Sequence, residues 1–421
     1  MYSKARWLIL FSAAVAIMSL YINMIVFAPI LGNIAGSLDV DMGTATNLMM
    51  GFVLSVACVL IWGGVVCDKF GITAAFILGL LCTTIPATLM PLLGQSFSAV
   101  FVARLIQGAS VGFIFATIGP ILALWFPPKE QGLAAGVLFG SISLGSTIGV
   151  VASPVLLEVL GSWEITVAVM SIPGWAGIVM AYLFTRQTPS PEVIETLQAG
   201  TASGKNDLTV KQALALPKTV IVTAVIVCNA WAMYCMYNLV PPFLAAPAPM
   251  GVGLPPVSAG NLSLALTSVG IIAPFVGGIF FDRIVKGNPK PAVIIGFALT
   301  GLFTYVISLP SIFGNMPALI VCLMLAGWGI PFMGSSLSAF IATSYPPDMV
   351  GRMMGFCFGV GTLGGALGLY LGGRSIGSTG NFVIAMTMIS GAALVGIILM
   401  LPLKGKQTAK IPAEAEISRI S

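Results

Sequence analysis

One cation, Arg104, stands inside an apolar stretch that runs from about residue 97 to 124. At about 1.5 Å per residue in a helix, it lies roughly 10 Å from the outer end of that stretch. A charge at this depth is costly in hydrocarbon, so it should face protein, water or a ligand, and by default it marks a functional site. The alternatives are a structural ion pair and a side chain that reaches the outer surface.

No acidic residue lies securely inside an apolar stretch, and Glu158, near the end of the stretch 133–160, is the one close candidate. Proton-driven export of cationic drugs generally needs an embedded acid that exchanges a proton for the cation. A deep arginine without such an acid fits better with an anionic substrate, which could neutralise Arg104 itself. Glu158 is kept as the candidate coupling residue.

The remaining residue types argue against an enzyme, a metal centre or a channel. The sequence has no histidine, and its 7 cysteines lie within or beside apolar stretches without the spacing of a metal site or a disulfide framework. It contains no paired carboxylates, nucleophile constellation or ring of charges that would serve catalysis or ion conduction. We therefore expect no cofactor and no metal.

Membrane helices must position these residues. Of the 421 residues, 58% are hydrophobic and 7% are charged, whereas soluble domains contain roughly 25% charged residues. Twelve apolar stretches are each long enough to cross a hydrocarbon layer about 30 Å thick. They cover residues 7–31, 44–66, 72–93, 97–124, 133–160, 165–184, 219–244, 257–281, 292–309, 316–341, 353–371 and 382–403.

The basic residues predict the orientation, because cytoplasmic loops retain Lys and Arg. With the N-terminus inside, 16 of the 18 basic residues fall in cytoplasmic segments, and the exceptions are Arg104 and Arg374. We expect a multi-pass protein of the plasma (inner) membrane with both termini in the cytoplasm. The same loops account for the net charge of +5, so no nucleic-acid partner is needed.

The two halves of the sequence repeat each other. One interval of 214 residues relates the first block of matches to its copy, as from Asp68 to Asp282, and an interval of 219 relates the second block, as from Gly145 to Gly364. Shared composition of glycine-rich helices explains this less well, because an Asp-basic pair and a double proline also align. Duplicated halves imply a transporter with its site between them.

At this point the chain resembles the major facilitator superfamily, over nearly its whole length. The loop signature of that family, glycine, three residues, Asp, a basic residue, any residue and Gly, is matched after the second stretch, although the further basic residues that usually follow are missing. The intramembrane Arg-x-x-Gln-Gly pattern is also matched. The residues that carry the resemblance are Gly64, Asp68, Lys69, Phe70, Gly71, Arg104, Gln107, Gly108 and Gly112.

The resemblance implies two latches between the halves on the cytoplasmic side. Asp68, beside Lys69, should bind the start of the eleventh helix near Arg352. Asp282, beside Arg283, should face the fifth helix near Lys129. An aspartate at a helix end can accept hydrogen bonds from a neighbouring helix N-terminus or an arginine. The alternative is a solvated turn carboxylate.

Further candidate substrate-binding residues lie in the helices that line the cavity by family resemblance, the first, fourth, seventh and tenth. Trp231, Tyr234 and Asn238 share one face of the seventh helix, because they are separated by three and then four residues. Aromatic residues near an interface can equally be belt anchors. Asn47 and Asn261 are as suited to helix capping as to substrate contact. With Arg104 and Gln107, the candidates are Tyr21, Asn23, Trp231, Tyr234, Asn238 and Trp328.

We therefore predict an all-α membrane protein of twelve helices in two pseudo-symmetric six-helix bundles, 1–184 and 218–403, joined by a cytoplasmic linker, 185–217, and followed by a tail, 404–421. The predicted function is alternating-access transport of a small organic or inorganic anion. A proton-coupled multidrug or metabolite efflux antiporter is the alternative. The expected partners are the substrate, the bilayer and a co-transported proton, and the expected state is a monomer.

Overall fold

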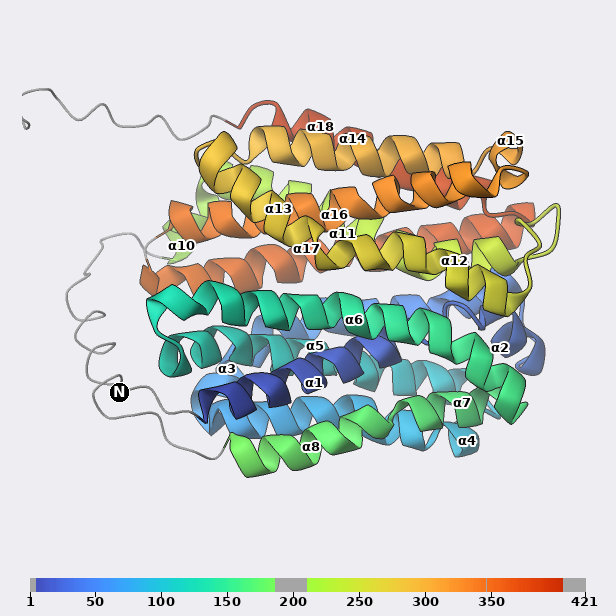
Figure 1. Cartoon of the computed structure of the whole chain (residues 1–421), viewed down its shortest axis with the longest axis horizontal. Helices are drawn as coiled ribbons and strands as arrows, with labels where there is room; N and C mark the ends of the chain where they lie inside the picture. The colour runs from blue at the N-terminus through green and yellow to red at the C-terminus, as the bar shows by residue number, and fades with distance from the viewer. Residues whose placement is uncertain (1–4, 186–209, 346, 404–421) are drawn as a thin grey trace, which may run out of the picture.

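Twelve helical spans in the structure are long and apolar enough to cross a membrane, as the sequence predicts. The computed structural model describes residues 5–185, 210–345 and 347–403, and every regular element in these ranges is a helix (Figure 1). In the first half these are α1 (Arg6–Ile25), α2 (Leu31–Ser37), α3 (Met42–Thr88), α4 (Met90–Leu93), α5 (Phe97–Trp125), α6 (Pro128–Leu160), α7 (Trp163–Met170) and α8 (Ile172–Phe184). In the second half they are α10 (Val210–Ala215), α11 (Pro217–Ala245), α12 (Pro256–Ser268), η1 (Val269–Ile271), α13 (Ala273–Ile279), η2 (Phe280–Ile284), α14 (Lys290–Ile307), α15 (Pro310–Phe313), α16 (Met316–Ser344), α17 (Pro347–Thr379) and α18 (Val383–Met400).

The helices form two bundles that lie side by side, α1 to α8 in one and α11 to α18 in the other (Figure 1). α1 begins and α18 ends at the same end of the molecule, as an even number of spans requires. Most of the predicted linker, 186–209, and the predicted tail, 404–421, lie outside the described residues. We call the opposite end, where α3 begins and α17 ends, the outer end, after the orientation that the basic residues predict.

The repeat in the sequence corresponds to a repeat in the way the helices of each bundle pack. Gly108 of α5 lies so close to α3 that an added Cβ would overlap the carbonyl oxygen of Phe52. In the second bundle, a Cβ at Gly327 of α16 would overlap the carbonyl oxygen of Leu266 in α12. The glycines are separated by 219 residues and their partners by 214, the two intervals found in the sequence. Small residues that let helix backbones touch are the usual basis of helix association in a bilayer.

One helix end departs from the predicted spans. The second and third spans, which share the label α3, are two helices that meet at a sharp turn at Gly71, whose φ of 83° is readily adopted only by glycine. The first helix is shorter than the predicted stretch 7–31, because α1 ends at Ile25 and the chain continues through turns to α2. Pro29, four residues after Ile25, has no N–H to donate to the carbonyl of Ile25, and the apolar pattern alone does not register this local signal.

Replacing Gly327 by alanine should destabilise the second bundle, because the added methyl group has no space between α16 and α12. We expect a loss of about 1–3 kcal/mol, the usual range for overpacking, seen as a lower unfolding temperature in detergent. The matched control is Gly278→Ala, since nothing lies within 4 Å of a Cβ at that glycine. Equal stability of the two variants would contradict the role assigned to Gly327.

Candidate functional site

Arg104 is completely buried within the first bundle, between α1, α3 and α5. Its Nη1 donates to the carbonyl oxygen of Asn23 at 2.9 Å, and its Nη2 donates to that of Met24 at 2.9 Å. Its Nε donates to the carbonyl oxygen of Leu48 in α3 at 3.2 Å. A planar guanidinium with five donors can bind several carbonyls in this way, whereas an ammonium offers one compact charge.

Two aromatic rings and one amide complete the surroundings of Arg104. The guanidinium carbon lies 4.4 Å from the ring centre of Phe27 and 4.6 Å from that of Phe52, so a ring π-face stabilises the charge at each position. Gln107 accepts a hydrogen bond from Nη1 at 3.1 Å, and its Nε2 lies 3.4 Å from the carbonyl oxygen of Thr83. Gln107 thus connects the buried charge to the second span of α3.

These contacts stabilise the end of α1, where Pro29 already prevents a regular continuation. The last carbonyls of a helix have no main-chain partner, and a cation near them also interacts favourably with the helix dipole. Arg104 supplies both effects to the carbonyls of Asn23 and Met24 from 81 and 80 residues away in the sequence. A local signal and a tertiary contact thus act at the same helix end.

Arg104 and Gln107 have no exposed surface in this conformation. The expected direct contact between Arg104 and a solute has no support in this geometry. The two alternatives, an ion pair and a side chain that reaches the outer surface, do not describe Arg104 either. Its partners are carbonyl oxygens, an amide and aromatic rings. In this conformation Arg104 holds together the helices of the first bundle.

Replacing Arg104 by lysine should lower the stability of the protein, because an ammonium cannot serve the carbonyls of Asn23, Met24 and Leu48 together. We expect a loss of about 1–3 kcal/mol, the usual cost of an unsatisfied buried polar group, measured as thermal unfolding in detergent. Arg283→Gln is the control, since Arg283 is exposed. Unchanged stability of Arg104→Lys together with a raised KM would instead indicate direct solute contact.

Three tyrosines lie on helices of the two bundles. Tyr21 of α1 is within electrostatic range of Tyr234 and Tyr237 of α11, and its ring centre lies 6.3 Å from that of Phe115. The hydroxyl of Tyr237 lies 3.9 Å from a Cβ position at Gly270, and the Oγ of Ser143 in α6 lies 2.7 Å from the same position. Hydroxyl groups from both bundles thus gather near the middle of the protein.

Two buried polar atoms of α11 have no hydrogen-bond partner, Nε1 of Trp231 and Oδ1 of Asn229. Asn229 faces α16, where its Nδ2 lies 3.7 Å from a Cβ position at Gly334. Buried polar groups without partners are uncommon in folded proteins, and each one requires an explanation. A solute that supplies the missing hydrogen bonds is one such explanation.

The other candidate residues lie in different surroundings. Asn238 is buried and its Nδ2 donates to the carbonyl oxygen of Tyr234 at 2.8 Å, within its own helix. Asn23 likewise donates to the carbonyl oxygen of Ser19 at 2.9 Å, and its Oδ1 has no partner. Trp328 packs against an apolar cluster inside the second bundle. Asn238 therefore lies next to Tyr234 and Tyr237 with its amide N–H already used within α11, and Trp328 lies in the packing of the second bundle.

The bundles touch main chain to main chain at the outer end. A Cβ at Gly43 of α3 would overlap the carbonyl oxygen of Gly373 in α17 and would lie 2.6 Å from the nitrogen of Gly377. Between α12 and α6, a Cβ at Gly260 would lie 2.9 Å from the carbonyl oxygen of Val150. Near the inner end of α17, nothing lies within 4 Å of a Cβ at Gly355. The two halves are therefore closed at the outer end.

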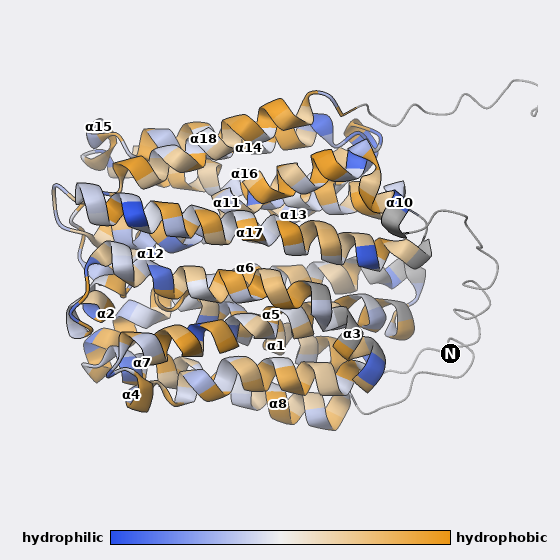
Figure 2. Cartoon of the chain, turned by 180° about the vertical axis from the view of Figure 1, so that it is seen from behind, coloured by the Kyte–Doolittle hydropathy of each residue, from blue (hydrophilic) through white to orange (hydrophobic). Residues whose placement is uncertain are grey.

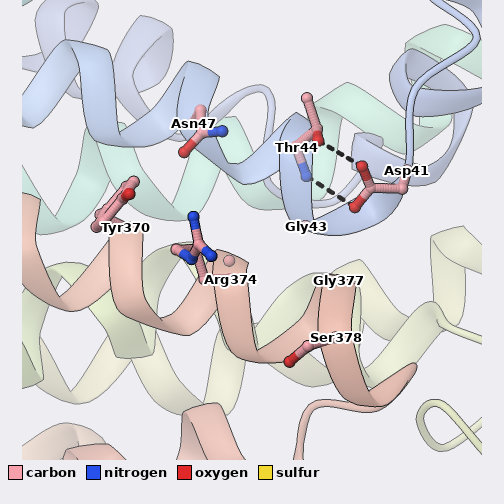
Figure 3. Close-up of a pocket in the computed structure, with 9 residues that line it drawn as sticks. Asp41, Gly43, Thr44, Asn47, Tyr370, Arg374, Gly377 and Ser378 are labelled. Carbon is pink, nitrogen blue, oxygen red and sulfur yellow. Dashed lines mark hydrogen bonds between the residues drawn. The ribbon is translucent and has the colours of Figure 1, made fainter.

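A cavity of about 330 Å³ lies beside this outer contact, between the start of α3 and the end of α17 (Figure 3). Asp41 caps α3 by accepting from the backbone N–H of Thr44 at 3.0 Å and from the Thr44 hydroxyl. The hydrogen bond from the Thr44 side chain lowers the pKa of the Asp41 carboxyl. Asn47 is not the cap but lines the cavity. The lining residues are Asp41, Gly43, Thr44, Asn47, Tyr370, Gly373, Arg374, Gly377 and Ser378.

Gly43→Val should prevent closure of the outer end, because a branched side chain has no space against Gly373. A steric cost of about 1–3 kcal/mol shifts a two-state equilibrium roughly tenfold or more. We expect faster labelling of a cysteine placed at Asn47 by a membrane-impermeant thiol reagent. Gly391→Val is the control, since its Cβ position is open, and equal labelling in both variants would argue against the outer contact as a gate.

The predicted latches stay predictions, because the side chains of Asp68 and Lys129 lie outside the described part of the structure. The other residues of the two predicted latches are exposed, namely Lys69, Arg352, Asp282 and Arg283. The nitrogen of Lys69 lies 5.3 Å from the ring centre of Phe70. Glu158 is also exposed, two residues before α6 ends, which gives no support to a coupling role.

Sequence comparison agrees with this architecture. The model of the Major Facilitator Superfamily matches residues 9–311 and 226–419, which together cover nearly the whole chain. The chain belongs to the major facilitator superfamily. With its twelve spans, this member of the superfamily is a multi-pass membrane transporter.

Several relatives carry the names of anion or hexuronate transporters. The chain is 23% identical over 393 residues to "Probable anion transporter 5" of Arabidopsis thaliana, covering 88% of this chain and 87% of that protein. It is 23% identical over 361 residues to "Hexuronate transporter" of Bacillus subtilis (strain 168), covering 82% of each. It is also 23% identical over 344 residues to "Probable anion transporter 7" of Oryza sativa subsp. japonica, covering 77% of this chain and 75% of that protein.

Sequence reasoning missed several residues that the structure brings into contact. Tyr237 follows Tyr234 by three residues, a spacing that could have included it on the same helix face. Arg6 of α1 forms an ion pair with Glu130 of α6 at 2.9 Å. Nothing in the sequence pairs these two residues, because 124 residues separate them.

Proposed function

We propose that the chain carries a small organic anion, such as a hexuronate, between the two bundles by alternating access. The names of relatives that align over most of both chains support the substrate class. The close approach of Gly43 to Gly373 at the outer end supports a mechanism in which the bundles meet and separate at that end during the cycle.

The observation that carries the choice of an anion is the uncompensated charge of Arg104. Its partners in the described structure are carbonyls, an amide and aromatic rings. Every acidic residue of the sequence lies near the end of a span or outside the spans. At an effective dielectric constant of about 20, one charge acts on another about 10 Å away with on the order of 1–2 kcal/mol. The charge of Arg104 in the first bundle thus favours an anion over a cation between the bundles, even though Arg104 does not contact the solute.

The binding surface of this proposal is the group of Tyr21, Tyr234 and Tyr237 with the unpaired Nε1 of Trp231 and Oδ1 of Asn229. Hydroxyl and indole N–H groups donate to carboxylate and hydroxyl oxygens, and an amide oxygen accepts from a sugar hydroxyl. A hydroxylated carboxylate satisfies more of these groups than an inorganic anion does.

The proposal is tested by counterflow in proteoliposomes loaded with glucuronate. We expect labelled glucuronate to accumulate against its gradient, because counterflow requires a carrier with a site that is exposed to each side in turn. Glucose and tetraphenylphosphonium serve as the neutral and cationic comparisons. Exchange of the cation without exchange of any anion would favour the efflux alternative over the proposed function.

Trp231→Phe keeps the aromatic ring and removes its unpaired N–H. We expect the KM for glucuronate to rise about tenfold, the effect of losing one hydrogen bond to a charged group, with unchanged unfolding temperature. The control is Trp175→Phe, because Nε1 of Trp175 already donates to Thr88 at 2.9 Å. An unchanged KM in Trp231→Phe would remove that residue from the site.

A further inference from the structure

The residues that line the outer cavity come from the start of α3 and the end of α17, and none of them comes from α11. Three glycines of α17, Gly364, Gly365 and Gly368, face α11, where Val227, Tyr234 and Trp231 fill the space. A different stripe of α17 points away from α11 and is exposed, with spacings of four, three and four residues that keep it on one helix face. This stripe consists of Leu363, Leu367, Tyr370 and Arg374.

A matching stripe runs along α3, which packs against α17. Leu54, Cys58 and Trp62 are exposed and follow Asn47 by seven, eleven and fifteen residues, so all four share one face. α17 crosses the face seen in Figure 2, with hydrophobic residues along most of its length and hydrophilic residues near each end. The groove between the two bundles is therefore apolar at membrane depth and polar at its outer end.

Arg374 supplies the charge at that polar end. It is the one basic residue that the predicted orientation places at the outer surface. Its guanidinium points from α17 toward Asn47 of α3 (Figure 3), and it has no hydrogen bond or ion pair to any residue that the structure describes. The nearby carboxylate of Asp41 turns to Thr44 and is occupied by its two hydrogen bonds.

We propose that this groove binds one phospholipid of the outer leaflet, with its phosphate at Arg374 and its acyl chains along the two apolar stripes. A guanidinium binds a phosphate through paired N–H donors, and the hydroxyl of Tyr370 and the amide of Asn47 offer further donors around the cavity. The exposed leucines below require hydrocarbon, which a phospholipid supplies and a free anion does not. The charge of Arg374 thus matches the phosphate of a phospholipid, and the two apolar stripes match its acyl chains.

The position of this lipid connects it to the motion of the bundles. Its site is shared between α3 and α17 at the place where Gly43 meets Gly373, so the two walls separate when the outer end opens. A lipid bound across both walls stabilises the closed outer end. Solute chemistry does not enter this argument, so the lipid site and the anion specificity stand or fall separately.

The test is hydrogen exchange of the delipidated protein, read at residues 41–47 and 370–378, during titration with phosphatidylglycerol. We expect these two segments to become protected, with half-saturation weakened about tenfold in Arg374→Gln and less in Arg374→Lys. Arg283→Gln, an exposed arginine at the other end of the molecule, should behave as the unaltered protein. Unchanged unfolding temperatures in the absence of lipid show that the variants are folded.

Two further titrations separate the sources of the ligand. Diacylglycerol, which lacks the phosphate, and inorganic phosphate, which lacks the acyl chains, should each give no protection at the concentration where phosphatidylglycerol protects. Protection by inorganic phosphate alone would identify a free-anion site and overturn the lipid assignment. Equal protection of Arg374→Gln and the unaltered protein by phosphatidylglycerol would also overturn it.

Discussion

The arrangement of the first bundle depends on one buried guanidinium. Arg104 joins α5 to the last carbonyls of α1 and to a carbonyl of α3, with an aromatic ring against it from each of two segments. Such a charge is stable in hydrocarbon only while these partners remain in place. The same contacts stabilise the end of α1, and with it the position of Tyr21 two residues before Asn23.

The second bundle repeats the packing of the first without its charge. The interval of 219 residues that relates Gly108 to Gly327 also relates Arg104 to Leu323, which is fully buried. α11 continues to Ala245, and the position of α16 that corresponds to Arg104 carries an apolar side chain. The bundles therefore share helix contacts, but only the first has a cation at this depth of the described helices.

The parts of the molecule that sequence predicted are those set by local composition. Span lengths follow from apolar stretches, and the repeat follows from glycines such as Gly108 and Gly327, whose spacing is preserved. Arg104 was recognised as costly, but its partners could not be read, because backbone carbonyls leave no mark in a sequence. The same limit hid the proximity of Tyr21 to Tyr237, because the two helices that carry them are distant in the chain.

The meeting of Gly43 and Gly373 has a consequence for the speed of the transport cycle. Interlocked side chains must leave their rotamer wells before two helices can part, and that requirement adds to the activation barrier. At this contact the main chains of α3 and α17 meet at glycines, and the side chain packed against Gly373 is the small one of Thr46. Few side chains therefore have to change rotamer when these two helices part, which keeps this contribution to the activation barrier small.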